Sequence, residues 1–237
     1  GNINQNSTVL EIGAGTGNLT NYILEKKPKK LFIIEKDEKL VEKLKKRFNK
    51  EIEIINKDVL KVSENLISSE KLIVYGNLPY NISTQILSKW ITNDNQNEWF
   101  TNYILMFQRE VADRILAETN SKNYGRLSIL TSWKLNVKKI LNISPSCFVP
   151  KPKVESTLLN FSPKKNYLKL KNSKNLEIVT RVFFNQRRKK IKNPLNQLFK
   201  NSDKIIEKLK LNIELRPQNL SAETYYKIAK EYESSRN

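Results

Sequence analysis

The sequence contains no histidine, and this absence excludes several classes of catalytic site. Without imidazole there is no Ser-His-Asp or Cys-His catalysis and no histidine-ligated metal. The single cysteine, Cys147, cannot form an intramolecular disulfide or a thiolate cluster for zinc. We therefore expect no metal site, and the low cysteine content fits a reducing compartment.

Acidic residues are few compared with basic ones. The 237 residues include 43 Lys and Arg against 24 Asp and Glu, which gives a net charge of +19. This surplus favours a polyanionic partner such as nucleic acid, although a genome rich in A and T also enriches lysine and is the alternative explanation. No apolar run approaches the roughly 18 residues of a membrane span, and no signal peptide opens the chain. We expect a monomeric protein without a membrane partner, located in the cytoplasm or in an organelle.

Short apolar runs alternate with amphipathic stretches through the first 110 residues, as in a parallel sheet with crossover helices. Two further strands follow later, joined by a loop that Pro145, Pro150 and Pro152 punctuate. We predict an α/β, Rossmann-like domain with a mostly parallel seven-stranded sheet over residues 1–165, and a small helical domain over 166–237. The predicted strands are 8–12, 31–35, 52–55, 72–75, 103–107, 136–141 and 156–161, the predicted helices are 18–25, 37–50, 84–91, 111–117 and 126–133, and 162–166 is a linker.

A glycine-rich loop, Glu11-Ile-Gly-Ala-Gly-Thr-Gly17, directly follows the first predicted strand. Its glycines allow a tight turn and the close approach of a ligand to the carboxyl edge of the sheet. The alternative is an ordinary tight turn without a ligand. NAD is the competing ligand, but its loop has a third glycine three positions after the second, whereas Gly15 and Gly17 are two apart. The loop therefore favours S-adenosylmethionine.

Two carboxylates follow the next two predicted strands. Glu35 closes the second strand, where it can accept hydrogen bonds from both ribose hydroxyls of a nucleotide-type cofactor. Asp58 lies just after the third strand, where it can accept one from an adenine amino group. For each the alternative is a solvated acid or a helix cap, and Asp37 is the expected cap of the helix that follows Glu35.

The tetrapeptide Asn77-Leu78-Pro79-Tyr80 follows the fourth predicted strand. An exocyclic adenine amine is a poor nucleophile, because its lone pair is delocalised into the ring. The Asn77 side-chain oxygen and the Leu78 carbonyl, held rigid by Pro79, can accept hydrogen bonds from its two N–H groups. Tyr80 can stack on the extruded base. The motif is typical of methylation at adenine N6 or at a glutamine side chain, reactions that need no strong general base, and the positive charge favours nucleic acid. A proline turn with a buried tyrosine is the other alternative.

These motifs and several others together resemble one family, the small-subunit ribosomal RNA adenine N6,N6-dimethyltransferases of the KsgA type. The resemblance runs from Val9 to about Ala229. It rests on the glycine loop, on Glu35 and Asp58, and on the segments Asn77–Thr84, Phe107–Ile115, Tyr124–Ser128, Phe148–Ser156 and Phe184–Lys190. The resemblance implies transfer of two methyl groups to each of two adjacent adenosines near the 3′ end of 16S-type rRNA, with a role in small-subunit biogenesis.

The resemblance also implies roles for individual residues. Tyr80 and Phe148 match aromatics that sandwich the target adenine, although Phe148 alone is equally typical of a core aromatic. The family usually carries an earlier segment with a Gln-Asn-Phe-Leu motif that closes over the methionine end of the cofactor. The sequence begins at Gly1, after the place of that segment, so the resemblance leaves its cofactor affinity and turnover open. The cofactor contacts implied are Gly13, Gly15, Gly17, Glu35, Asp58, Val59 and Asn77.

A dense basic cluster in the tail is the predicted contact with the small ribosomal subunit. A solvated helix face is the alternative for such a charge run. Two other functions stay open: a methyltransferase of the macrolide-resistance type that acts on large-subunit rRNA, and a non-catalytic RNA-binding assembly or transcription factor on the same fold. Leu78 and the basic tail favour the small-subunit type, and intact Asn77 and Tyr80 favour an enzyme. The predicted RNA-binding residues are Arg181, Arg187, Arg188, Lys189 and Lys190.

Overall fold

The computed structural model describes residues 2–93, 99–149 and 151–236, and these form two compact units. The sheet unit lies within Gly1–Trp90, Asn95–Ala112 and Val137–Pro163. The helical unit lies within Ile91–Asp94, Asp113–Asn136 and Lys164–Asn237. The domain boundary predicted at residue 165 stays a prediction. Residues 113–136 belong to the same compact unit as the tail.

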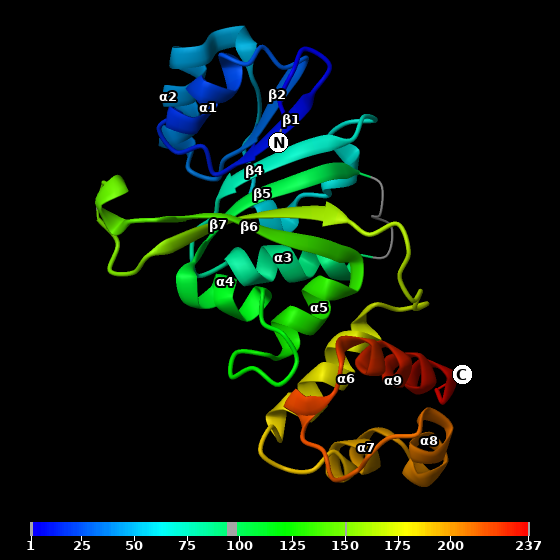
Figure 1. Ribbon diagram of the computed structural model, residues 1–237. Coiled ribbons are helices and arrows are strands. Elements are labelled where there is room, and N and C mark those ends of the chain that lie inside the picture. The colour runs from blue at the N-terminus through cyan, green and yellow to red at the C-terminus, as the bar shows by residue number, and fades with distance from the viewer. Residues whose placement is uncertain (1, 94–98, 150, 237) are drawn as a thin grey trace. The chain divides into compact units, whose positions relative to one another are not determined.

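A seven-stranded sheet forms the centre of the sheet unit (Figure 1). The strand order is β3-β2-β1-β4-β5-β7-β6, with parallel pairing from β3 through β5 and an antiparallel pair of β5 and β7. The predicted mostly parallel sheet is thereby confirmed. Its strand order reverses between β1 and β4, which is where open α/β sheets bind their ligands. The strands are β1 (Thr8–Ile12), β2 (Lys30–Ile34), β3 (Glu53–Ile55), β4 (Leu72–Asn77), β5 (Phe100–Gln108), β6 (Leu135–Ile143) and β7 (Ser156–Pro163).

Two helices, α1 (Asn18–Leu24) and α2 (Glu38–Phe48), lie beside β1 and β2 (Figure 1). Their apolar side chains enter a buried cluster with the strands, because α2 places its apolar residues at helical spacing and its lysines on the other face. Asp37 caps α2 as predicted, accepting hydrogen bonds from Lys39 N at 2.8 Å and Leu40 N at 3.2 Å. The buried cluster consists of Val9, Ala14, Ile23, Leu31, Ile33, Leu44, Phe48 and Ile52.

Most element boundaries differ from those predicted by one to three residues. β5 begins at Phe100, three residues early, because the Phe100 ring stacks on Tyr103 at 3.7 Å between centroids and continues the buried strand. β7 runs through Pro163 and takes in two residues of the predicted linker, since proline is tolerated at a strand terminus. The loop between β6 and β7 is not wholly irregular. It holds a 3₁₀ turn at Pro145–Cys147, because Ser144 Oγ accepts a hydrogen bond from Ser146 N. Pro150 lies outside the described residues.

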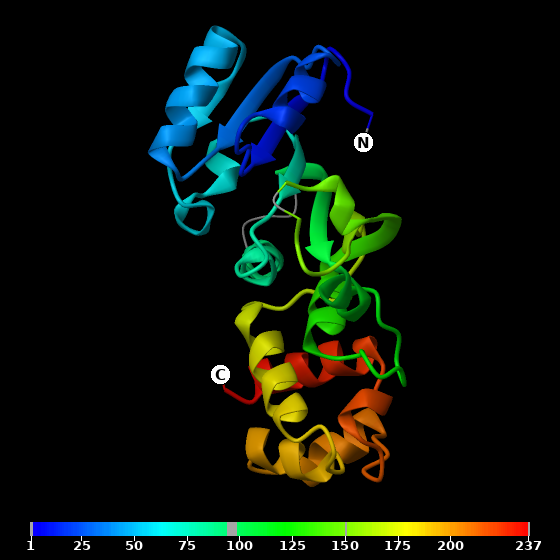
Figure 2. The ribbon, with the colours of Figure 1, turned by 90° about the vertical axis from the view of Figure 1, so that its left-hand side faces the viewer.

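The helical unit is built from α5 (Arg126–Lys134) and the helices of the tail (Figure 2). α6 packs against α5, α7 and α9, and the Phe183 and Tyr225 rings meet edge to face at 5.3 Å. The prediction of short helices is confirmed for the described part of the tail. Among the described residues, no helix has the length and apolar character that crossing a membrane requires. The other α-helices among the described residues are α3 (Ser83–Thr92), α4 (Arg109–Ile115), α6 (Lys174–Asn185), α7 (Lys192–Leu198), α8 (Ser202–Leu209) and α9 (Ala222–Ser234).

Candidate active site

The glycine loop connects β1 to α1 through three residues with positive φ. Gly13, Gly15 and Gly17 have φ values of 69°, 59° and 83°, in the left-handed region that favours glycine. A Cβ on Gly17 would lie 2.4 Å from Phe48 Cε2, whereas one on Gly15 would meet no atom within 4 Å. Gly17 therefore serves the packing of the loop on α2, and Gly15 leaves open space at the carboxyl edge of the sheet.

Glu35 follows β2 and turns its carboxylate toward this loop. Its side chain is buried, with Oε2 accepting a hydrogen bond from Gly15 N at 3.1 Å and Oε1 accepting from Lys36 N and Asp37 N at 2.8 and 3.0 Å. A carboxylate offers about four acceptor positions. The three backbone donors fix its orientation and leave about one position, on Oε2, for a ligand hydroxyl. The predicted contact with two ribose hydroxyls stays a prediction.

Asp58 caps the 3₁₀ turn Val59–Lys61 just after β3. Its carboxylate accepts hydrogen bonds from Leu60 N at 3.0 Å and from Lys36 Nζ at 3.0 Å. The bond from the Lys36 ammonium, with help from Leu60 N, lowers the pKa of Asp58. The side chain of Val59 is buried, and its carbonyl accepts a hydrogen bond from Lys89 Nζ at 3.0 Å. The cofactor contacts predicted for Asp58 and Val59 are untested.

Glu11 is the fourth of the five residues of strand β1, just before the loop, and its protonation was not predicted. Its side chain is 2% exposed and accepts a hydrogen bond from Thr20 Oγ1 at 2.7 Å. Burial raises the pKa of Glu11 to about 7, against the lowering effect of the Thr20 bond and with a further rise from the nearby Glu35 carboxylate. The sequence signal for a buried carboxyl group was an acidic residue within a mostly apolar strand. In the part of the chain that the structure describes, no three Cys, Asp or Glu side chains gather as metal ligands.

The Asn77-Leu78-Pro79-Tyr80 segment leaves the sheet at the end of β4. Asn77 is the last residue of that strand and is exposed, while Leu78 is 1% exposed and anchors the segment in the core. A Cβ on Gly13 would lie 3.9 Å from the Asn77 carbonyl oxygen, so the glycine loop and this segment adjoin. The Pro79 carbonyl accepts hydrogen bonds from Ile82 N and Ser83 N, both at 3.1 Å, and so begins α3. The structure thus brings together two of the motifs predicted to share a site.

Tyr80 is fixed by a partner on a distant strand. Its hydroxyl lies 2.8 Å from Ser156 Oγ at the start of β7, and its carbonyl accepts a hydrogen bond from Ser83 Oγ at 3.2 Å. Ser156 is fully buried, and its role was not predicted, because 76 residues separate it from Tyr80. Phe148 is half-buried directly after the 3₁₀ turn Pro145–Cys147. Its place beside Tyr80 stays a prediction.

The predicted RNA-binding residues of the tail differ in how they are held. Arg187 Nε donates to Gln218 Oε1 at 3.1 Å, and its guanidinium also bonds the Lys122 carbonyl, so this residue ties segments of the helical unit together. Lys190 forms an ion pair with Glu214. Arg181, Arg188 and Lys189 are exposed. A hollow of about 420 Å³ opens here, lined by Phe184, Asn185, Gln186, Arg187, Arg188, Lys189 and Asn193.

Comparisons with known proteins identify chains of similar sequence and fold. A small-subunit rRNA methyltransferase A of Pelagibacter ubique is 61% identical over 231 residues, which cover 98% of this chain and 88% of that protein. A dimethyladenosine transferase structure from Plasmodium falciparum superposes with a TM-score of 0.82 at 28% identity, covering 98% of this chain and 92% of that one. The structure of the 23S rRNA methyltransferase ErmE has a TM-score of 0.68 at 19% identity, covering 98% and 93%, and at that identity shows the fold alone.

The family profile described as ribosomal RNA adenine dimethylase matches residues 1–234. That match spans the glycine loop, the Asn77–Tyr80 segment and the basic tail alike, and it confirms the resemblance drawn from the motifs. Since the match covers nearly the whole chain and a relative at 61% identity covers 98% of it, the chain belongs to the ribosomal RNA adenine dimethylase family.

Proposed function

We propose that this chain transfers methyl groups from S-adenosylmethionine to the N6 amines of two adjacent adenosines near the 3′ end of small-subunit rRNA. The observation that carries the proposal is the exposed Asn77 at the end of β4, directly beside the glycine loop. The names of the relatives supply the substrate class, and a role in small-subunit biogenesis follows from it.

The residues at the sheet edge fit S-adenosylmethionine. Gly15 leaves the space that a Cβ would otherwise fill, and Glu35 offers an oriented acceptor at the end of β2, where a ribose lies in such folds. Asp58, and the backbone around Val59, stand after β3, where we place the adenine of the cofactor. When bound, S-adenosylmethionine supplies a methyl group on a sulfonium, and the carbon–sulfur electron pair stays with sulfur as the methyl group leaves.

The Asn77–Tyr80 segment activates the target amine. Asn77 Oδ1 and the Leu78 carbonyl accept hydrogen bonds from the two N–H groups, which frees the nitrogen lone pair from the ring. The adenine nitrogen then forms its bond to the methyl carbon and loses a proton to solvent. Leu78 is buried and Pro79 restricts the backbone, so the two acceptors keep their positions during the reaction. A second transfer requires the site to accept a base that already carries one methyl group, and stacking on Tyr80 holds it without crowding the amine.

The Asn77→Ala variant tests the proposal. We expect kcat/KM for methyl transfer to unmethylated small subunits to fall by about 100-fold or more, as when one preorganised polar group is removed from an active site. Asn136→Ala, the same change at an exposed position near the start of β6, is the matched control and keeps wild-type activity. The measurement is incorporation of labelled methyl groups into rRNA. Equal rates for Asn77→Ala and wild type would refute the enzymatic role of the segment.

Primer extension on the methylated rRNA locates the product. Stops at two adjacent adenosines near the 3′ end of the small-subunit rRNA are expected. Stops in large-subunit rRNA alone would instead assign the chain to the macrolide-resistance type of activity. Absence of any methyl transfer by the wild type, together with intact subunit binding, would favour a non-catalytic assembly factor.

A further inference from the structure

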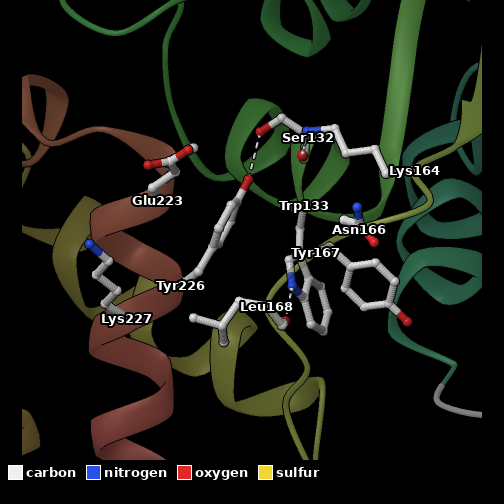
Figure 3. Close-up of a pocket in the computed structure, with 10 residues that line it drawn as sticks. Ser132, Trp133, Lys164, Asn166, Tyr167, Leu168, Glu223, Tyr226 and Lys227 are labelled. Atoms are coloured by element: carbon white, nitrogen blue, oxygen red, sulfur yellow. Dashed lines mark hydrogen bonds between the residues drawn. The ribbon is translucent and has the colours of Figure 1, made fainter.

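The helical unit contains a second hollow, of about 410 Å³, that includes none of the residues assigned above (Figure 3). It lies between the end of α5, the segment 164–168 that follows β7, and the first turns of α9. Its volume falls within the range of roughly 300–1,000 Å³ typical of small-molecule sites. The lining residues are Ser132, Trp133, Lys164, Asn166, Tyr167, Leu168, Ala222, Glu223, Tyr226 and Lys227.

Aromatic rings form the walls of this pocket. Trp133 is 1% exposed and meets the half-buried Tyr167 edge to face, with ring centroids 5.9 Å apart. The Lys134 ammonium lies 4.4 Å from the Trp133 ring and 5.9 Å from the Tyr167 ring, so cation–π attraction helps to hold both rings. Tyr226 projects from α9 and points its hydroxyl toward Ser132 of α5 (Figure 3). The pocket therefore presents rigid aromatic surface against which a planar group can stack.

The polar groups inside the pocket are also held in place. Tyr226 Oη donates to the Ile129 carbonyl at 3.1 Å and lies 2.9 Å from Ser132 Oγ. Ser132 Oγ also donates to the Ile129 carbonyl at 3.3 Å, and its two acceptor lone pairs leave it able to accept a hydrogen bond from a ligand. Trp133 Nε1 donates to the Leu168 carbonyl at 2.8 Å, which fixes the segment that carries Tyr167. The pocket is thus organised before any ligand binds.

Charged and amide side chains surround the opening. Asn166, Glu223 and Lys227 are exposed, and Lys164 Nζ bonds the Ser132 carbonyl at the pocket wall. Residues 164–237 carry 19 Lys and Arg against 7 Asp and Glu, so the surroundings attract polyanions. Amide and carboxylate groups match the donor and acceptor edge of a base, and the ammonium groups match its phosphates. A purely apolar or anionic peptide would leave one of these sets without a partner.

We propose that this pocket binds an unpaired nucleobase of rRNA, other than the adenosines that react. The base stacks on Tyr167, its edge meets Asn166, Ser132 Oγ and Glu223, and Lys227 contacts the adjacent phosphate. Recognition of unpaired bases by stacking on aromatic side chains is the common mode in RNA-binding proteins. The inference rests on the proposed function for the identity of the RNA, and it gives the helical unit a base-specific contact besides its basic cluster.

Equilibrium binding of purified, unmethylated small subunits over a range of salt concentrations tests the pocket. Tyr167→Leu is expected to weaken binding about tenfold at every salt concentration, because stacking is not ionic. Tyr167→Phe keeps the ring and binds as wild type. Lys227→Gln is expected to reduce the slope of log K against log salt by about 0.7, the value for one phosphate contact on a single strand. Wild-type affinity for Tyr167→Leu overturns the proposal.

Two matched controls separate the pocket from general effects. Tyr22→Leu makes the same substitution at an exposed tyrosine of α1, and Lys174→Gln removes one exposed lysine at the start of α6. Both are expected to bind like wild type. Circular dichroism and urea unfolding check that each variant folds.

A crosslinking experiment keeps the proposal testable if Tyr167→Leu fails to fold. Lys227→Cys, in a Cys147→Ser background, carries a benzophenone label at the mouth of the pocket. A crosslink to one unpaired nucleotide of the small subunit is expected, and a crosslink only to duplex RNA, only to a ribosomal protein, or to nothing overturns the proposal. Methyl transfer by the wild type is measured in parallel: if it is absent while the crosslink forms, the proposed function fails and the base-binding pocket stands.

Discussion

At the scale of single residues, Glu11 shows that burial can raise the pKa of a carboxyl group whose position in the motif gives no sign of it. Its carboxyl group is enclosed at the end of β1, and the Thr20 hydroxyl is its hydrogen-bond partner. Burial raises the pKa of Glu11 to about 7 from an ordinary value of 4.5. The folded protein therefore binds a proton more tightly than the unfolded chain does. Ionisation of Glu11 therefore lowers the free energy of unfolding relative to the protonated form.

The pH dependence of stability follows from this shift. Between pH 4.5 and about 7 the folded state holds more protons than the unfolded state, so the contribution of Glu11 to the free energy of unfolding falls as pH rises. The total loss is about 3 kcal/mol, complete above the folded pKa. Glu11→Gln keeps an acceptor for Thr20 but cannot ionise. We expect it to match wild type near pH 4.5 and to be more stable at pH 8, measured by urea unfolding.

The control for this prediction is Glu25→Gln, which removes one carboxylate from an exposed position near the end of α1. It should follow the wild-type pH profile. Parallel profiles for Glu11→Gln and wild type would contradict the assignment.

At the scale of elements, the loop from β1 to α1 separates two uses of glycine. Gly15 and Gly17 both have positive φ, which costs a residue with a Cβ about 1–2 kcal/mol. Only at Gly17 would the added Cβ also collide with a buried ring, that of Phe48. We expect Gly17→Ala to lower the free energy of unfolding by about 1–3 kcal/mol more than Gly15→Ala, because overpacking adds to the backbone cost.

Urea unfolding of the two variants at one pH checks this difference, each serving as the control for the other. The binding of S-adenosylmethionine gives a second comparison. Gly15→Ala fills the open space at the sheet edge. Its loss of binding free energy for the cofactor should therefore exceed its loss of unfolding free energy. Equal unfolding free energies for the two variants would show that α2 moves away from the loop at little cost.

The elements themselves were predictable where local pattern decides them. Short apolar runs indicated each of the seven strands that the described residues form. Asn77 was expected at the sheet edge, because parallel strands present their carboxyl ends together. The pairing of Tyr80 with Ser156 was not predictable, since it depends on the antiparallel register of β5 and β7. The early start of β5 depends in the same way on tertiary contacts, the pairing of Phe100 with Leu72 of β4 and the packing of Trp90 from α3 against Tyr103.

At the scale of the whole molecule, the sequence shows where basic residues cluster but not where cavities form. The run Arg187-Arg188-Lys189-Lys190 is visible as a basic cluster, but its members have different tasks. Arg187 bonds Gln218 and the Lys122 carbonyl, whereas Arg188 and Lys189 are exposed. The pocket around Tyr167 gave no sequence signal at all, because residues near 132, 166 and 226 form it together.

The double variant Arg188→Glu with Lys189→Glu tests whether this cluster grips rRNA. Two phosphate contacts are replaced by repulsion, so we expect small-subunit affinity to fall at least tenfold, with a salt slope reduced by about 1.4–1.8. Both residues are exposed, so the free energy of unfolding should stay within about 0.5 kcal/mol of wild type. S-adenosylmethionine affinity should also be unchanged, because the glycine loop belongs to the sheet unit.

Two comparisons decide how the result is read. Lys45→Glu with Lys46→Glu makes the same change of charge on the exposed face of α2, and a comparable loss of subunit affinity there would mean that net charge alone attracts the RNA. Arg187→Glu should lower both subunit affinity and stability, because it also releases Gln218 and the loop at Lys122. If the Arg188 and Lys189 double variant is stable and keeps wild-type affinity and salt slope, this cluster does not contact rRNA and other surfaces of the protein must do so.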